Sequence, residues 1–356
     1  MNAPRTDHVR DGAVATQVLL DDDEIRIEHF DRGGAGGTLV VTFDPIAYLW
    51  DRPPFGHEFL RKQSLDVVAV RKKSENFYQP LSREAFEAAV APVASRYARV
   101  VSYGSSLGAY AALYFGRDEP WTVIASSPRN STHPMFGAKV WQEKVAFRHE
   151  RMDPSVRPRC SAIILYDPRD AFDRRYMEGE VLPQFVDADV RRIPYSGHPS
   201  NHVLSEMGFI APFVRAILGG WRGSAWPTLD RRAQRTRSAV YFHVLALHAV
   251  NKGHVAWADA LVSRSLAMRP GSMLALRVQG MVRLAQARYA EAEEVLARAV
   301  AIDPQDPLNI GLLQRARDGE RAPPLQPDAA PGIPAGMFRR WRGKLGQWRR
   351  RLLGRG

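Results

Sequence analysis

Short runs of hydrophobic residues alternate with helix-like segments over much of this chain, a pattern typical of proteins that combine strands and helices. Runs of β-branched and aromatic residues predict strands at 14–20, 24–30, 38–43, 66–71, 99–103, 122–126, 160–166 and 189–193. Apolar residues at helical spacing predict helices at 81–97 and 107–115. The alternation of the two kinds of element favours an α/β fold, with a mainly parallel sheet covered by helices.

A sharp turn links one predicted strand to the helix that follows it. The run at 99–116 reads RVVSYGSSLGAYAALYFG and places Ser106 between Gly104 and Gly108. A serine at such a turn is pushed out of the backbone, and small residues two positions to either side let strand and helix pack closely. Free N–H groups at the helix start favour negative charge. The pattern predicts Ser106 as a nucleophile and the Leu107 N–H as an oxyanion donor.

An acid and a histidine follow the serine in the order that this kind of turn requires. The sequence DPRD at 167–170 comes directly after one predicted strand, and PYSGH at 194–198 comes directly after the next. The spacing from Ser106 to Asp170, and from there to His198, leaves room for a strand, a helix and another strand at each step.

These motifs resemble those of the α/β-hydrolase superfamily, and the resemblance covers about residues 14–218. In that family the acid commonly lies three residues beyond a strand-ending glycine, and the histidine commonly follows a glycine, as it does at 197–198. Asp167 occupies the usual glycine position here, so Asp167 and Asp170 compete for the role of the acid. Position favours Asp170, with Asp173 as a third candidate.

The resemblance implies a Ser-His-Asp triad of Ser106, His198 and Asp170 that works through an acyl-serine intermediate. A histidine can take up the serine proton near neutral pH, and the aspartate would hold the imidazole in the required tautomer. The expected activity is that of a serine hydrolase of the esterase or thioesterase type, with a sugar or other hydroxyl group as an alternative acceptor of the acyl group. The competing hypothesis is a binding protein that recruits partners and whose triad is vestigial.

The resemblance also implies a second oxyanion N–H in the loop after the strand at 38–43. Pro45 has no N–H, so Asp44 or Ile46 is expected to supply it. No cofactor is expected. A metal site is not expected either, because His57 has no histidine four residues further on and the single cysteine, Cys160, sits inside a strand.

The segment 128–158 lies between two predicted strands and is longer than an ordinary loop, so it is the best candidate for a small cap over the serine. Its basic residues are Arg129, Lys139, Lys144, Arg148, Arg151 and Arg157, against the acidic Glu143, Glu150 and Asp153. Such charges indicate an anionic substrate or, more commonly, a solvated helix face.

A second region of different composition follows the hydrolase-like part. Residues 221–237 are rich in tryptophan, proline and arginine and indicate a linker. Beyond it, Pro270 and Pro304 lie 34 residues apart and end the matching phrases SLAMRP and AVAIDP. This period resembles that of tetratricopeptide repeats, and residues 238–317 are expected to form a small all-α domain of two repeats and a capping helix. Two repeats are marginal alone, so we expect them to pack on the hydrolase domain or to bind a protein partner.

The C-terminal part divides into a proline- and alanine-rich tether at 318–336 and a basic tail at 337–356. The tail places Phe338, Trp341, Leu345, Trp348 and Leu352 on one helical face. Residues 333–356 hold eight of the Lys and Arg residues and no acid, so most of the net charge of +12 lies there. A basic amphipathic helix with tryptophans predicts binding to an anionic membrane surface through residues 337–353, with nucleic acid or an acidic protein as rivals. No nucleic acid is expected to bind the body of the protein.

Composition limits the remaining possibilities. The 356 residues exceed one ordinary domain, and 45% hydrophobic residues are enough to build real cores. No apolar run is long enough to span a membrane, and the first residues have no apolar signal segment. One cysteine fits a reducing compartment. These features favour a cytoplasmic protein, with peripheral attachment to the inner face of the membrane if the tail binds there.

Overall fold

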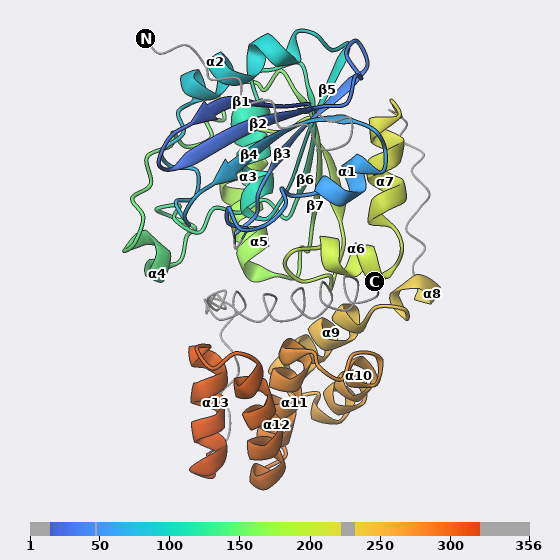
Figure 1. The fold of residues 1–356 in the computed structure, drawn as a ribbon. Helices are drawn as coiled ribbons and strands as arrows, with labels where there is room; N and C mark the ends of the chain where they lie inside the picture. The colour runs from blue at the N-terminus through green and yellow to red at the C-terminus, as the bar shows by residue number, and fades with distance from the viewer. Residues whose placement is uncertain (1–14, 47, 222–231, 321–356) are drawn as a thin grey trace, which may run out of the picture. The chain divides into compact units, whose positions relative to one another are not determined.

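The computed structural model describes residues 15–46, 48–221 and 232–320. The chain forms two compact units that divide between residues 229 and 230, inside the expected linker. We call residues 15–221 the sheet unit and residues 232–320 the repeat unit (Figure 1). The basic tail and nearly all of the tether lie outside the described residues, so membrane binding stays a prediction. Within the described ranges no helix is long and apolar enough to cross a membrane.

The sheet unit is built on one eight-stranded sheet with the strand order β1-β2-β4-β3-β5-β6-β7-β8. The strands are β1 (Ala15–Asp21), β2 (Ile25–Asp31), β3 (Thr38–Phe43), β4 (Asp66–Lys72), β5 (Arg99–Ser105), β6 (Thr122–Ser126), β7 (Ser161–Tyr166) and β8 (Asp189–Arg192). β2 pairs antiparallel with β1 and with β4, and every other neighbouring pair is parallel. The mainly parallel sheet expected from the sequence is therefore confirmed.

Helices cover both faces of this sheet (Figure 1). They are α1 (His57–Arg61), α2 (Arg83–Ala94), α3 (Leu107–Gly116), α4 (Lys139–Gln142), α5 (Ala171–Tyr176) with a π-helical turn η1 (Met177–Val181), α6 (Asn201–Glu206) and α7 (Ile210–Leu218). The predicted strands all form within two residues of their expected ends. The helix predicted at 81–97 is shorter because Ser82 caps its start, with the side chain accepting the Ala85 N–H.

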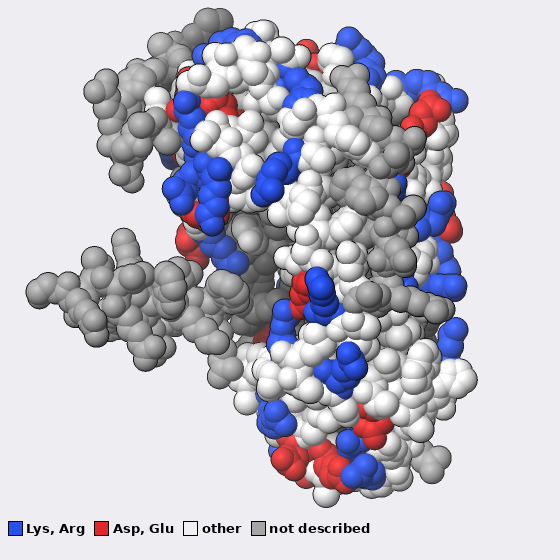
Figure 2. All heavy atoms as spheres, turned by 90° about the vertical axis from the view of Figure 1, so that its right-hand side faces the viewer, with Lys and Arg blue, Asp and Glu red and all other residues white. Residues whose placement is uncertain are grey.

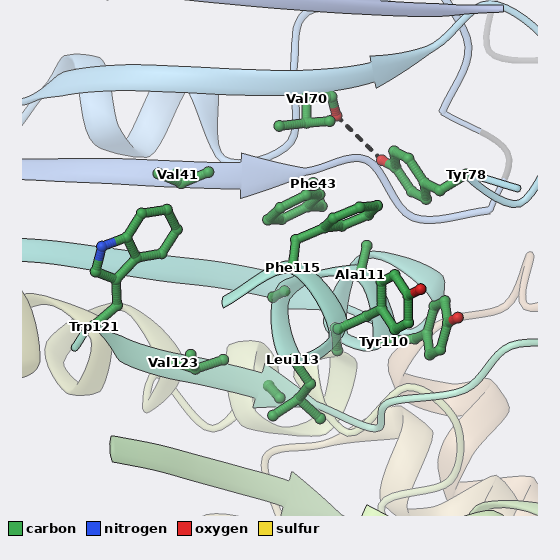
Figure 3. Packing of buried hydrophobic residues seen from close by; sticks show 14 of the residues in the cluster. Val41, Phe43, Val70, Tyr78, Tyr110, Ala111, Leu113, Phe115, Trp121 and Val123 are labelled. Atoms are coloured by element: carbon green, nitrogen blue, oxygen red, sulfur yellow. Dashed lines mark hydrogen bonds between the residues drawn. The ribbon is translucent and has the colours of Figure 1, made fainter. Parts of the chain in front are cut away.

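Successive side chains of the central strands point to opposite faces of the sheet, so each face has its own hydrophobic core. In β3, Val41 and Phe43 point into the core shared with α2, α3 and α5, while Val40 points into the core shared with α1, α6 and α7. Figure 3 shows the first core, where Phe115 of α3 stacks on Phe43 with ring centroids 5.8 Å apart. Every residue of α3 is buried. This packing fixes the helix that begins directly after Ser106.

The described part of the repeat unit consists of helices, of which α9, α11 and α13 start 34 residues apart, as do α10 and α12. The helices are α8 (Arg232–Arg235), α9 (Ala239–Asn251), α10 (Val255–Met268), α11 (Met273–Ala285), α12 (Tyr289–Ile302) and α13 (Pro307–Arg317). Ser238, Ser272 and Asp306 precede α9, α11 and α13, and each side chain accepts a backbone N–H of the first turn. These helices agree with the expected all-α region, and the identification as tetratricopeptide-like repeats stays a prediction.

Candidate active site

The turn after β5 has the strained geometry that the sequence predicts. Ser106 has φ 55° and ψ −119°, a conformation that residues with a side chain rarely adopt. A Cβ atom on Gly104 would lie 2.1 Å from the Gly108 carbonyl oxygen, and one on Gly108 would lie 2.3 Å from the Phe43 carbonyl oxygen. Only glycine fits at either position. The close approach of Gly108 to β3 also brings the loop after β3 next to Ser106.

Three side chains from separate segments of the chain form a continuous hydrogen-bonded series at the carboxyl edge of the parallel strands. The Oγ of Ser106 lies 2.7 Å from Nε2 of His198. Nδ1 of His198 lies 2.8 Å and 3.0 Å from the two carboxylate oxygens of Asp173. Because the carboxylate only accepts, the proton is assigned to Nδ1, which leaves Nε2 free to accept the serine proton.

The structure differs from the expectation for the acid, because Asp173 and not Asp170 contacts His198. Asp170 is the residue before α5, and its side chain accepts the Asp173 N–H at 2.9 Å. Its capping role starts the helix at Ala171 and puts Asp173 in the first turn, facing His198. The signal that could have found this is the Asp170-x-x-Asp173 spacing, because an aspartate before a helix is a common cap.

Asp167 has a different role, which is to join the acid loop to the histidine loop. Its buried carboxylate accepts the N–H groups of Arg169 at 2.8 Å, Tyr195 at 3.0 Å and Gly197 at 2.7 Å. Burial raises the pKa of Asp167 to about 6, against the effect of these donors. The carboxylate thus fixes the backbone directly before His198 without touching the imidazole.

The Asp173 carboxylate is fully buried and faces a second positive group. Nη1 of Arg129 lies 3.5 Å from its Oδ1. Burial by itself would raise the pKa of the Asp173 carboxyl, but the charges of His198 and Arg129, with hydrogen bonds from His198 and Ser127, lower it below its usual value. Asp173 is therefore held as an anion beside the imidazole.

The two expected oxyanion donors, the N–H groups of Leu107 and Asp44, differ in the hydrogen bonds that they make within the protein. Leu107 is the first residue of α3, where a helix leaves its N–H groups without intrahelical acceptors. The N–H of Asp44 instead donates to the Val70 carbonyl at 3.4 Å, which continues the pairing of β3 with β4. This favours Ile46, the alternative in the same loop, over Asp44.

The loop after β3 is held in place by buried groups that the sequence analysis missed. Nζ of Lys72 donates to the carbonyls of Pro45 at 3.0 Å and Tyr48 at 2.9 Å. The hydroxyl of Tyr78 lies 2.9 Å from the Asp44 carbonyl and 3.1 Å from that of Val70. An apolar environment makes such bonds costly to break, so this loop has a defined position beside Ser106.

The segment 128–158, which is expected to cap the serine, is held in place by buried polar side chains, including a contact of His133 with Glu180 of η1. His133 is fully buried, with Nδ1 accepting the Met135 and Phe136 N–H groups and Nε2 lying 3.2 Å from the carboxylate of Glu180. Glu180 also accepts from Arg151 at 3.0 Å. Arg129 and Arg151 are thus already paired within the protein. On the face shown in Figure 2, basic and acidic side chains are interspersed.

No group of three or more histidine, cysteine, aspartate or glutamate side chains among the described residues is arranged to hold a metal ion. Cys160 is a free, half-buried thiol directly before β7, and burial raises its pKa to about 12. A thiol in that state is a poor nucleophile.

Comparison with known proteins finds similar architectures but no close relative. No family model matches the chain, and no curated protein matches it. Among solved structures, a dienelactone hydrolase from Anabaena variabilis is 15% identical over 58% of this chain and 95% of its own, with a TM-score of 0.38. A capsule O-acetyltransferase of Neisseria meningitidis serogroup A is 10% identical over 59% and 96%, with a TM-score of 0.41. An esterase of Pyrococcus furiosus is 13% identical over 59% and 91%, with a TM-score of 0.38.

Proposed function

We propose that this chain, whose sheet unit has the α/β-hydrolase fold, is an acyl-transfer enzyme of the serine esterase or thioesterase type. The observation that carries the proposal is the unbroken series Ser106, His198 and Asp173, in which each hydrogen bond has the length and direction that nucleophile activation requires. A strained serine directly before a fully buried helix supports the same conclusion.

In the proposed reaction the Oγ of Ser106 attacks the carbonyl carbon of an ester or thioester, and Nε2 of His198 takes its proton. Asp173 stabilises the resulting imidazolium and does not itself become protonated. The N–H groups of Leu107 and Ile46 would receive the negative charge on the carbonyl oxygen. His198 then gives the proton to the leaving group, and an acyl-serine remains.

The second half of the reaction repeats the same proton transfers with a different nucleophile. His198 takes a proton from water, or from the hydroxyl group of a sugar or another alcohol, and the acyl group leaves Ser106 as an acid or a new ester. Water gives a hydrolase and an alcohol gives an acyltransferase. Adding increasing concentrations of an alcohol to a reaction with an activated acetyl ester, and measuring the ratio of new ester to acetate, separates the two.

The competing hypothesis is a binding protein with a vestigial triad. A binding role does not require a buried aspartate, a correctly oriented imidazole and a strained serine in contact with one another. Each of these features costs folding free energy, so the binding hypothesis leaves them unexplained. The geometry therefore favours an enzyme.

Labelling with a fluorophosphonate probe tests the proposal directly. The purified full-length protein should take up the probe covalently at Ser106, and Ser106→Ala should abolish the labelling without unfolding the protein. Ser105→Ala is the matched control, because Ser105 is the neighbouring buried residue at the end of β5. Failure of the folded protein to label, or labelling that survives Ser106→Ala, would overturn the proposal.

A further inference from the structure

Arg129 follows β6 and contacts the candidate active site in two places. Its backbone N–H donates to the Ser106 carbonyl at 3.2 Å, and its guanidinium lies 3.5 Å from the Asp173 carboxylate. The guanidinium also lies over the Phe172 ring, 5.2 Å from its centroid. The side chain is only 9% exposed. Within the described part of the chain, Asp173 is the one carboxylate with which Arg129 forms an ion pair.

A buried cation at this place changes the electrostatics of the whole site. The Asp173 carboxylate alone would strongly favour a proton on the imidazole, since the two groups are in direct contact in a medium of low polarity. The Arg129 charge, on the same carboxylate oxygen that contacts Nδ1 of His198, offsets part of that attraction. The negative potential at the imidazole is therefore weaker than the carboxylate alone would make it.

We propose that Arg129 is a positioning residue that keeps His198 in its neutral, proton-accepting form at lower pH, by sharing the negative charge of Asp173. This inference rests on the proposed function for its kinetic consequence. Its electrostatic part concerns only the titration of the imidazole.

The other groups that face His198 do not account for such an effect. Ser106 is neutral, and Asp173 is the carboxylate that Arg129 itself contacts. Asp167 contacts the backbone of the histidine loop through the Gly197 N–H and is present in every variant of Arg129. A difference between Arg129 variants therefore reports on the guanidinium.

The test compares Arg129→Met and Arg129→Gln with Arg129→Lys in the full-length protein. We expect the two neutral variants to move the acidic limb of the kcat/KM profile for an activated acetyl ester upward by about one pH unit. Arg129→Lys should keep the profile close to that of the wild type, because it preserves the charge. Arg129→Gln keeps hydrogen-bonding capacity if Arg129→Met folds poorly.

An NMR titration of the His198 ring signals, assigned by their loss in His198→Gln, gives a readout that needs no activity. The midpoint should move upward in the neutral variants and stay in place in Arg129→Lys. A reduced rate with unchanged midpoints of the kcat/KM profile and of the NMR titration would show that Arg129 has a merely structural role. A change confined to KM would show that Arg129 acts in substrate binding. Either result overturns the inference. Absence of probe labelling together with a shifted NMR midpoint would instead refute the proposed function alone.

Discussion

Buried polar groups serve different purposes in the two units of this protein. In the sheet unit they converge on one place, where Ser106, His198 and Asp173 come from three separate segments of the chain. In the repeat unit they fasten one helix to another: Nε of Arg277 in α11 donates to Asn309 of α13 at 2.7 Å. The first arrangement orients reactive atoms, and the second fixes how helices pack.

Backbone strain follows the same division. Three non-glycine residues with positive φ lie at or beside the candidate active site: Ser106 at 55°, Ser127 at 49° and Tyr195 at 64°. In the described part of the repeat unit, Ala287 at 58° is the single non-glycine case, in the turn between α11 and α12. The sheet unit has three further cases, Ser64 at 53°, Phe77 at 55° and Tyr78 at 61°. Backbone strain that is held by surrounding hydrogen bonds is common at functional sites. The comparison teaches that substitution of a residue of the Ser106, His198 and Asp173 series should change rates, while substitution in the buried network of the repeat unit should change stability.

Asp173→Asn should have the largest effect of all the substitutions, and this effect should be on the reaction rate. The asparagine can donate an N–H to Nδ1 of His198, which leaves the ring proton on Nε2, where it blocks acceptance of the Ser106 proton. We expect kcat to fall by about 10⁴-fold, with a folded protein by circular dichroism. The measurement is hydrolysis of an activated acetyl ester; a loss below tenfold would show that Asp173 is not the acid.

Arg277→Met should lower stability without changing that rate. Arg277 is buried between Asp306 and Asn309, so its removal leaves the Asp306 carboxylate without its partner. We expect the free energy of unfolding of the repeat unit to fall by about 3 kcal/mol. Denaturant unfolding of the full-length protein measures it.

Arg317→Met is the matched control for this prediction. Arg317 pairs with Glu293 at 2.9 Å, but both side chains are about half exposed. The expected loss is below about 1 kcal/mol. Equal effects of the two substitutions would contradict the assignment of a special role to the buried network.

Asp167→Asn should lower the stability of the protein, and the size of this loss should decrease as pH rises. The amide cannot accept at the position that faces the Gly197 N–H, so the histidine loop loosens at every pH. Because the folded-state pKa of Asp167 is raised to about 6, the wild type has stability from this group at low pH and loses it as pH rises through 6. The asparagine does not titrate. The stability of the wild type relative to the variant should therefore fall by about 2 kcal/mol from about pH 4.5 to 7.5; a constant difference in urea unfolding would refute this.

Asp170→Asn should have the smallest effect. The asparagine side-chain oxygen can still accept the Asp173 N–H and cap α5. We expect the ester hydrolysis rate to stay within about threefold of the wild type, since caps of this kind tolerate asparagine. A loss comparable to that of Asp173→Asn would return the acid role to Asp170.

The sequence predicted the strands, the strained serine and the histidine because each has a local signal. The acid was missed because its identity depends on where α5 begins, and the side chain of Asp170, rather than the end of β7, decides that. Arg129 has no local signal at all, because its contact with Asp173 joins segments far apart in the chain. The preference for Ile46 over Asp44 depends on how far β3 pairs with β4, which is a property of the sheet.

The turn around Ser106 also limits how this protein can change over evolutionary time. Position 106 already carries a side chain, while Gly104 and Gly108 face main-chain atoms that a side chain would strike. A cysteine at position 106 would need no backbone change and could bring thiol chemistry to the same site. Any larger residue at either glycine would separate the strand from the helix. The side chain at position 106 is therefore the easiest part of this turn to exchange, and the two glycines are the hardest.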